Sequence, residues 1–354
     1  MKKANVILLV ATMLCACAGQ NKTYYLHGSF KDTSSSMVYL ICSGKVIDSV
    51  KVDDQNQFSF NGDAAVPQLA YVANARNTNE ATQVCTVILE PGLMTVFPFE
   101  GMEDYIVTGT KSNDLLADFA KYTVEIMEEY RKNMNDAQKV DEIDNKLISH
   151  IQKEAVKNKD NMYGLVCVKN LSNGEQEPEK TREMLDTFTK EIHQSELWKS
   201  LDERNLKMLA TTAGHKYMEF SQADAYGNVI ASKDVMSTPG VKYVLIDFWA
   251  SWCGPCMREV PYLTETYSKY FNKGFQILGV SLDRAKDPWQ KAIVENQMNW
   301  IHVSDLKYWD NAVAKQYGIN SIPANFLVEA ATGTIVATNL RGKELEKKIA
   351  ELLN

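Results

Sequence analysis

Two cysteines separated by two residues carry the strongest chemical signal in this chain of 354 residues. They lie in the run Trp252-Cys253-Gly254-Pro255-Cys256, after an apolar stretch and before a helix-like pattern. This spacing lets two sulfurs close a small disulfide loop, which is typical of redox sites. A helix beginning there would place Cys253 near solvent and among unpaired amide N–H groups that stabilise a thiolate. We therefore predict that Cys253 attacks a disulfide and that the more buried Cys256 resolves the mixed disulfide.

Two other interpretations of the cysteine pair are open. A structural zinc site would need a second pair of Cys or His residues at ligand spacing. None of the five histidines is paired with another at short spacing, so we expect no metal: His27, His150, His193, His215 and His302. A lone structural disulfide is the second alternative, and the position between a strand and a helix favours redox chemistry over it.

The N-terminal residues are typical of an exported protein. Lys2 and Lys3 precede the apolar run Val6–Leu14, which is too short to span a bilayer. The sequence Leu14-Cys15-Ala16-Cys17 resembles the bacterial lipobox, which implies that residues 1–16 form a signal peptide and that Cys17 carries a lipid. Ordinary cleavage or an uncleaved anchor are the alternatives. We expect a lipid-anchored protein of the cell envelope, facing the periplasm or the cell surface.

The remaining cysteines are scattered. An oxidising compartment preserves disulfides, but five cysteines after residue 17 are an odd number and too few for a disulfide framework. We expect Cys42, Cys85 and Cys167 to be buried thiols. A Cys42–Cys85 bridge is the alternative, because both residues fall in predicted strands.

Composition limits the class of protein. The hydrophobic content of 45% and charged content of 23% are those of an ordinary globular protein. The length predicts two or three domains. A formal net charge of −7 provides no basic surface for nucleic acid.

Two regions are expected to precede the domain that carries the cysteine pair. Residues 17–110 predict an all-β sandwich, because short alternating runs recur between turn clusters. These strands are expected at Tyr24–Phe30, Met37–Cys42, Val46–Val52, Gln57–Phe60, Ala70–Ala73, Val84–Leu89, Met94–Phe99 and Tyr105–Val107. Residues 111–216 predict four or five amphipathic surface helices, forming a spacer or small bundle.

Residues 217–354 alternate strand and helix and must position the cysteine pair. An apolar strand at Val241–Trp249 precedes the cysteines, and Val260, Leu263 and Tyr267 share one face of the following helix. Further elements are expected at Phe275–Val280, Pro288–Ile293, Ile301–Val303, Asp310–Tyr317, Asn325–Val328, Thr334–Thr338 and Lys343–Leu353. Such alternation, ending in a hairpin and a helix, predicts an α/β sheet.

The run from Val244 to Cys256 resembles the active-site strand and turn of thioredoxin. Met257–Pro261 is similar to the membrane-tethered TlpA-like reductases of the bacterial envelope. This resemblance covers about residues 217–354 and implies a thioredoxin fold whose redox-active disulfide needs no further cofactor. Residues 23–110 are similar to a β-domain of unknown function that precedes such modules in envelope lipoproteins, through Gly28, Asp48-Ser49, Phe58, Phe60 and Glu90-Pro91-Gly92.

The resemblance implies roles for two acidic residues. Asp247, six residues before Cys253, matches the buried acid beneath the thioredoxin disulfide. A desolvated carboxyl group has a raised pKa and can take the proton of Cys256. Glu259 matches a glutamate that tunes the TlpA-like site. A local hydrogen-bonding role for Asp247 and a solvated helix charge for Glu259 are the alternatives.

The resemblance also implies a substrate-binding surface. Ile322-Pro323 matches the cis-proline loop that faces the disulfide, where the backbone before the proline pairs with a substrate peptide. An ordinary turn proline is the alternative. The expected substrate-binding residues are Trp252, Gly254, Pro255, Ile322 and Pro323. Ala324-Asn325 departs from the common Thr-Thr of the family, which bears on substrate preference.

These observations predict a thiol–disulfide oxidoreductase that reduces or isomerises protein disulfides. Its expected partners are protein thiols and disulfides, with a membrane electron donor. One alternative is a partner-binding lipoprotein whose thioredoxin module is a docking domain. A thiol peroxidase is a further alternative, but Trp249–Trp252 do not match the Pro-x-x-x-Thr/Ser-x-x-Cys environment of that chemistry.

Overall fold

The computed structural model describes residues 22–31, 36–99, 104–172 and 177–353. Cys17 and the predicted signal segment lie outside these ranges. The chain divides into two compact units: one reaches Ile143 and includes Asn161–Tyr163, and the other holds Asp144–Asp160 and the chain from Gly164 onward. Within the described ranges, no helix combines the length and the apolar character needed to cross a bilayer.

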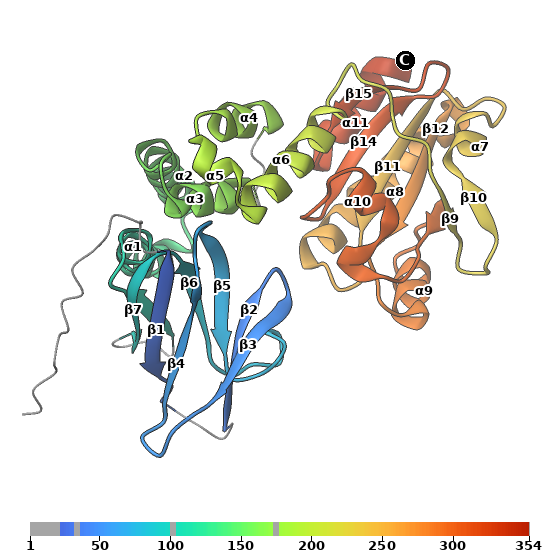
Figure 1. Ribbon diagram of the computed structural model, residues 1–354. Helices are drawn as coiled ribbons and strands as arrows, with labels where there is room; N and C mark the ends of the chain where they lie inside the picture. Colours follow the sequence, from blue (N-terminus) through green and yellow to red (C-terminus); the bar gives the residue numbers. More distant parts are fainter. Residues whose placement is uncertain (1–21, 32–35, 100–103, 173–176, 354) are drawn as a thin grey trace, which may run out of the picture. The chain divides into compact units, whose positions relative to one another are not determined.

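Two four-stranded sheets enclose the core of the first unit (Figure 1). One has the order β4-β1-β7-β8 and the other β3-β2-β5-β6. The strands are β1 (Thr23–Ser29), β2 (Met37–Cys42), β3 (Lys45–Lys51), β4 (Gln57–Asp63), β5 (Gln68–Ala73), β6 (Val84–Leu89), β7 (Gly92–Pro98) and β8 (Tyr105–Thr108). Leu26 and Phe60 alternate with exposed neighbours and meet Val72 and Val87 of the other sheet in one core, as a sandwich requires. The predicted all-β fold is confirmed.

The helical region follows the sandwich. Its described helices are α1 (Lys111–Asn133), α2 (Ala137–Lys157), α3 (Met162–Ser172), α4 (Pro178–Asp186), α5 (Lys190–His193) and α6 (Glu196–Leu209). The prediction of amphipathic surface helices is wrong for α3, where Met162, Leu165 and Val168 are fully buried. Because α3 is apolar around most of its circumference, burial is its only favourable environment.

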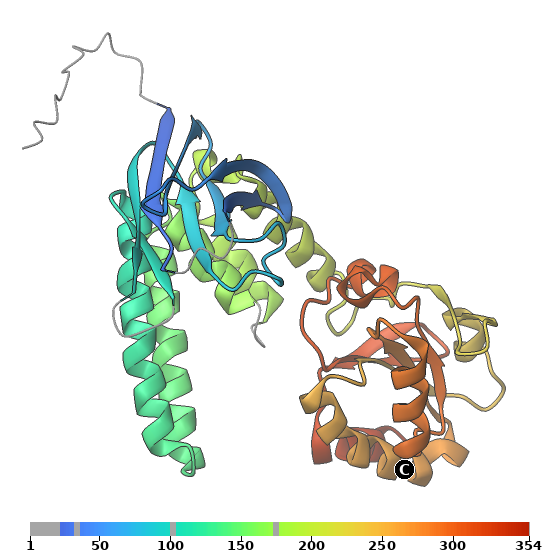
Figure 2. The same ribbon diagram turned by 90° about the horizontal axis from the view of Figure 1, so that it is seen from below.

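A five-stranded sheet of order β13-β12-β11-β14-β15 forms the centre of the last region, with helices on both faces (Figures 1 and 2). Its strands are β11 (Tyr243–Trp249), β12 (Phe275–Ser281), β13 (Ile301–Val303), β14 (Ala324–Glu329) and β15 (Thr334–Thr338). Its helices are α7 (Ser232–Met236), α8 (Gly254–Tyr270), α9 (Lys286–Glu295), α10 (Ala312–Gln316) and α11 (Gly342–Leu353). The predicted α/β fold is confirmed.

Strand β11 is central and almost completely buried. It runs parallel to β12 and antiparallel to β14. Val244, Ile246 and Phe248 are inaccessible to solvent, as expected for a strand covered on both faces. A hairpin of β9 (Ser221–Ala223) and β10 (Val229–Ala231), which the sequence analysis did not predict, precedes this sheet. The C-terminal end of the buried strand β11 leads directly to the cysteine pair.

Gly279 makes this part of the sheet possible. It lies on β12 between Asp247 of β11 and His302 of β13. A Cβ atom at Gly279 would lie 2.6 Å from Nδ1 of His302 and 3.0 Å from Nε1 of Trp249. Both rings are buried, so neither can move away without disturbing the core.

We expect Gly279→Ala to lower the free energy of unfolding by about 1–3 kcal/mol, the usual cost of overpacking a core. Denaturant unfolding of the oxidised protein measures this change. Gly254→Ala is the matched control, because a Cβ there would meet no atom closer than 3.8 Å. Equal stability of the two variants would contradict the steric role of Gly279.

Candidate functional site

The two cysteines form a disulfide where β11 leads into α8. Cys253 is the N-cap residue of α8, and Cys256 lies in its first turn. The backbone N–H of Cys256 donates to Sγ of Cys253 at 3.1 Å. The same N–H, together with the positive end of the helix dipole, would stabilise a thiolate on Cys253 after reduction.

The disulfide is less accessible than the sequence suggested. Cys253 is 5% exposed and Cys256 2% exposed, so the expected position of Cys253 near solvent is not met in the oxidised protein. The carbonyl oxygen of Ile322 lies 3.7 Å from Sγ of Cys253. Exposed residues surround the buried disulfide instead: Trp252, which is 45% exposed, Gly254 and Pro255.

Asp247 is a buried carboxyl group in the middle of the sheet. It is 3% exposed, and burial raises its pKa to about 7, an effect that the Arg341 charge opposes and the Glu259 charge reinforces. Asp247 and Cys256 line one small cavity of about 10 Å³, roughly the room that one water molecule needs. A group with this pKa can exchange a proton with a neighbouring thiol near neutral pH.

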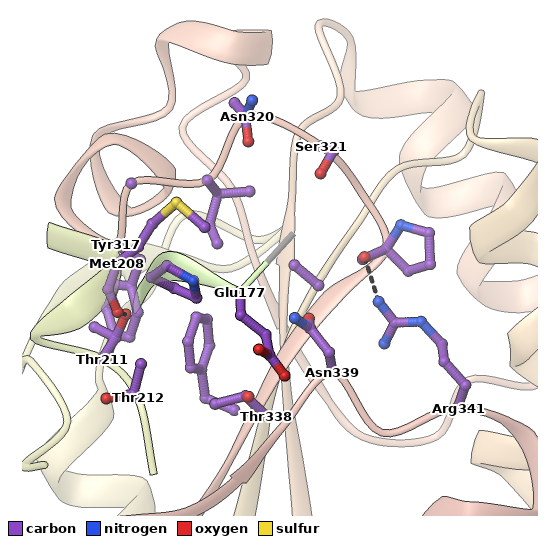
Figure 3. A pocket seen from close by; sticks show the side chains of 16 residues that line it. Glu177, Met208, Thr211, Thr212, Tyr317, Asn320, Ser321, Thr338, Asn339 and Arg341 are labelled. Carbon is purple, nitrogen blue, oxygen red and sulfur yellow. Dashed lines mark hydrogen bonds between the residues drawn. The ribbon is translucent and has the colours of Figure 1, made fainter. Parts of the chain in front are cut away.

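Glu259 and Arg341 line the same cavity as Asp247. Oε2 of Glu259 accepts the backbone N–H of Gly342 at 2.7 Å, at the start of α11. The guanidinium of Arg341 donates to the carbonyl oxygens of Pro323 and Leu340, and Figure 3 shows the first of these contacts. Sequence analysis missed Arg341, because no local pattern marks a residue that acts through distant loops.

The loop that faces the disulfide contains the predicted cis bond. The Ile322–Pro323 peptide is cis, as the resemblance implied. The loop leads into β14, where Ala324 and Asn325 pair with Phe248 and Asp247. The structure therefore places Cys253, Cys256, Asp247, Glu259, Ile322 and Pro323 in one continuous site.

Comparisons with known proteins identify the two end regions. Residues 240–335 match the model of a thioredoxin-like family, and residues 24–116 match a domain of unknown function, DUF4369. The thiol–disulfide oxidoreductase ResA of Bacillus thuringiensis is 28% identical over 145 residues, which are 40% of this chain and 76% of that protein. The C-terminal domain belongs to the thioredoxin-like family.

Solved structures include similar thioredoxin-like domains. The thioredoxin domain of a thiol–disulfide oxidoreductase from Bacteroides vulgatus is 36% identical, with 40% of this chain and 99% of that chain covered and a TM-score of 0.37. The C-terminal domain of a Bacteroides thetaiotaomicron homologue is 38% identical, with 40% and 97% covered and a TM-score of 0.37. The family match and the curated relatives confirm the predicted family and the predicted class of enzyme, a thioredoxin-like protein-disulfide oxidoreductase.

A buried carboxylate fixes the thioredoxin-like turn before the cysteines. Asp283 is 1% exposed and accepts hydrogen bonds from the backbone N–H and the hydroxyl of Ser251, and from the hydroxyl of Ser281. Three donors on one carboxylate compensate its desolvation and hold the turn against the end of β12. Sequence analysis missed this clamp, since aspartate after a strand is common in ordinary turns.

An aromatic surface lies beside Cys253, around its neighbour Trp252. The ring of Trp252 lies 4.9 Å from that of Tyr308 and 6.0 Å from that of Trp309. The guanidinium carbon of Arg284 lies 3.9 Å from the centre of the Tyr308 ring. Tyr308 has a positive φ of 58°, an uncommon backbone conformation for a residue other than glycine. Sequence analysis missed Tyr308 and Trp309, which had no pattern linking them to Trp252.

The three other cysteines among the described residues lie outside this site. Cys42, Cys85 and Cys167 are buried thiols, as predicted, and Cys42 and Cys85 are not bridged. Burial raises the pKa of Cys85 to about 12, which makes its thiolate inaccessible at neutral pH. In the described part of the chain, no three His, Cys, Asp or Glu residues come together as metal ligands would.

The raised pKa of Asp247 predicts how stability depends on pH. The folded protein binds this proton more tightly than the unfolded chain, so the contribution to stability is full below about pH 4 and is lost as the pH rises through about 7. Asp247→Asn has no charge to bury. We expect this variant to be more stable than the wild type above about pH 7, by at most about 4 kcal/mol, and not below about pH 4.

Denaturant unfolding of the oxidised proteins between about pH 4 and 8 measures this difference. Asp287→Asn, an exposed position in α9, is the matched control and should follow the wild-type curve. If the Asp247→Asn and wild-type curves run parallel over this range, Asp247 does not titrate in the folded protein.

Proposed function

We propose that this protein is a cell-envelope thiol–disulfide oxidoreductase that reduces or isomerises protein disulfides by dithiol exchange through Cys253 and Cys256. The observation that carries the proposal is the disulfide at the start of α8, where Sγ of Cys253 accepts the N–H of Cys256. The names of its relatives as thiol–disulfide oxidoreductases support the same chemistry.

The reaction begins with the reduced protein. The Cys253 thiolate attacks one sulfur of a substrate disulfide and forms a mixed disulfide, while the other substrate sulfur leaves as a thiolate and takes up a proton. Cys256 then loses its proton and attacks Sγ of Cys253. This step breaks the mixed disulfide, releases the second substrate thiol and leaves Cys253 and Cys256 oxidised. Two electrons pass to the substrate, and a dithiol donor at the membrane would restore the reduced pair.

In this proposal, Asp247 accepts the proton of Cys256. The two side chains line one cavity with room for about one water molecule, which can carry the proton between them. Arg341 lowers and Glu259 raises the pKa of Asp247, so these two residues act on the proton transfer through Asp247. They are positioning residues in this proposal.

The surroundings of the disulfide suit a polypeptide substrate. The backbone at Ile322 lies beside the reactive sulfur and can pair with an extended chain, while Trp252, Tyr308 and Trp309 offer apolar area. In the sheet, β11 lies between β14, which follows the cis-proline loop, and β12, which leads to Leu282. The indole N–H of Trp252 donates to the carbonyl oxygen of Leu282. The cis-proline loop and the aromatic residues are therefore separated by β11. A substrate chain that crosses the disulfide would therefore contact both.

The order of the two sulfurs provides the decisive experiment. Cys256→Ser should accumulate mixed disulfides with envelope proteins through Cys253, whereas Cys253→Ser should accumulate few, because only Cys253 has the helix-end environment of a nucleophile. Limiting iodoacetamide on the reduced protein, followed by peptide mass spectrometry, should label Cys253 first. Preferential labelling of Cys256 would reverse the assignment.

The envelope location rests on the lipobox-like residues Leu14–Cys17 and has its own test. Cys17→Ser should abolish metabolic labelling with a radioactive fatty acid and move the protein from the membrane to the soluble fraction. Cys15→Ser, two residues earlier, is the matched control and should keep the label. Lipid labelling that survives Cys17→Ser would rule out Cys17 as the anchor.

A further inference from the structure

A pocket of about 160 Å³ opens beside the cis-proline loop (Figure 3). One wall comes from the helical region and includes Pro178, Met208 and Thr211. The opposite wall comes from the thioredoxin-like domain, through the loop after α10, the start of β14 and the end of β15. All of these residues belong to the same compact unit of the chain.

The lining of the pocket suits a side chain that is mainly apolar. Buried Tyr317 and Phe326 join Met208 in an apolar inner surface. Figure 3 shows polar side chains around it, among them Asn339 and Arg341. Half of the lining residues are polar, so the pocket combines apolar area with polar groups that can fix the orientation of a ligand, as binding sites commonly do.

The two walls of the pocket are joined by direct contacts. The carbonyl oxygen of Ser172 at the end of α3 accepts hydrogen bonds from Arg204 of α6 at 2.7 Å and from Asn320 of the loop at 3.3 Å. Gly318 has a φ of 69°, and a Cβ there would lie 3.1 Å from the Arg204 carbonyl oxygen. This close approach holds the helical wall against the loop that leads to Pro323.

The pocket adjoins the small cavity below the reacting disulfide. Pro323 and Arg341 line both this pocket and the small cavity that holds Asp247 and Cys256. Ile322, the residue before Pro323, has its carbonyl oxygen 3.7 Å from Sγ of Cys253. An extended chain advances about 3.3 Å per residue, so a peptide bound along the loop reaches the pocket within a few residues of its cysteine.

We infer that this pocket receives an apolar side chain of the polypeptide substrate, close to the cysteine that reacts with Cys253. The inference rests on the proposed function and adds a role for the helical region, which would select substrates through Met208 and its neighbours. A compact disulfide without a peptide chain would react without using the pocket.

The test fills the pocket from each wall in turn. Met208→Trp adds bulk from α6, and Thr338→Trp adds bulk from the end of β15. Leu206→Trp is the matched control, because Leu206 lies on the same helix, is 53% exposed and does not line the pocket. The reduced full-length proteins are mixed with insulin or with bis(2-hydroxyethyl) disulfide, and the oxidation rate of each is measured by quenched thiol alkylation.

We expect both filling variants to lose about tenfold or more of their rate with insulin, the factor that burial of one apolar side chain can supply. Their rates with the small disulfide should match the wild type, and Leu206→Trp should keep both rates. Unchanged insulin rates, or an equal loss with both disulfides or in the control, would overturn the inference. A wild-type protein that reacts with neither disulfide would refute the proposed function itself.

Discussion

The cost of burying one carboxyl group organises the C-terminal domain. Asp247 lies on the central strand of the sheet, between Gly279 and Asn325, where bulk water cannot solvate its charge. A buried acid without a partner normally stays neutral, and here desolvation moves its pKa to about 7 rather than higher because the Arg341 charge opposes it. The pKa of Asp247 therefore lies near neutral pH, where small changes in its surroundings decide whether the carboxyl group carries a proton.

Several features depend on that arrangement. Gly279 leaves room for the buried rings beside the acid, and the cavity below the disulfide connects the acid with Cys256. Arg341 touches the cis-proline loop through the Pro323 carbonyl, and Glu259 binds the first residue of α11 next to it. The same side chains that set the proton affinity of Asp247 therefore also position the loop that faces the substrate.

Local sequence patterns predicted the parts of the protein that depend on neighbours in the chain. The eight strands of the sandwich, the strand and helix around Cys253 and the hairpin after Pro323 all follow from alternation, turn residues and spacing. The residues that were missed act across long sequence separations, as Arg341 does with Pro323 and Tyr308 with Trp252. The burial of α3 and the covering of Cys253 by Ile322 also arise from tertiary packing. The pattern of residues within one segment does not predict such packing.

The shared carbonyl of Ser172 has a consequence for the modular history of such chains. The family match begins at residue 240, yet Asn320 inside the match and Arg204 before it bind the same backbone atom. A genetic exchange that replaced only the matched segment would bring in a loop from another protein. That loop need not have a glycine at the position of Gly318, where the backbone comes close to Arg204 of α6. A replacement that keeps these contacts therefore needs a breakpoint upstream of α3, so that the helices and the redox domain move as one piece.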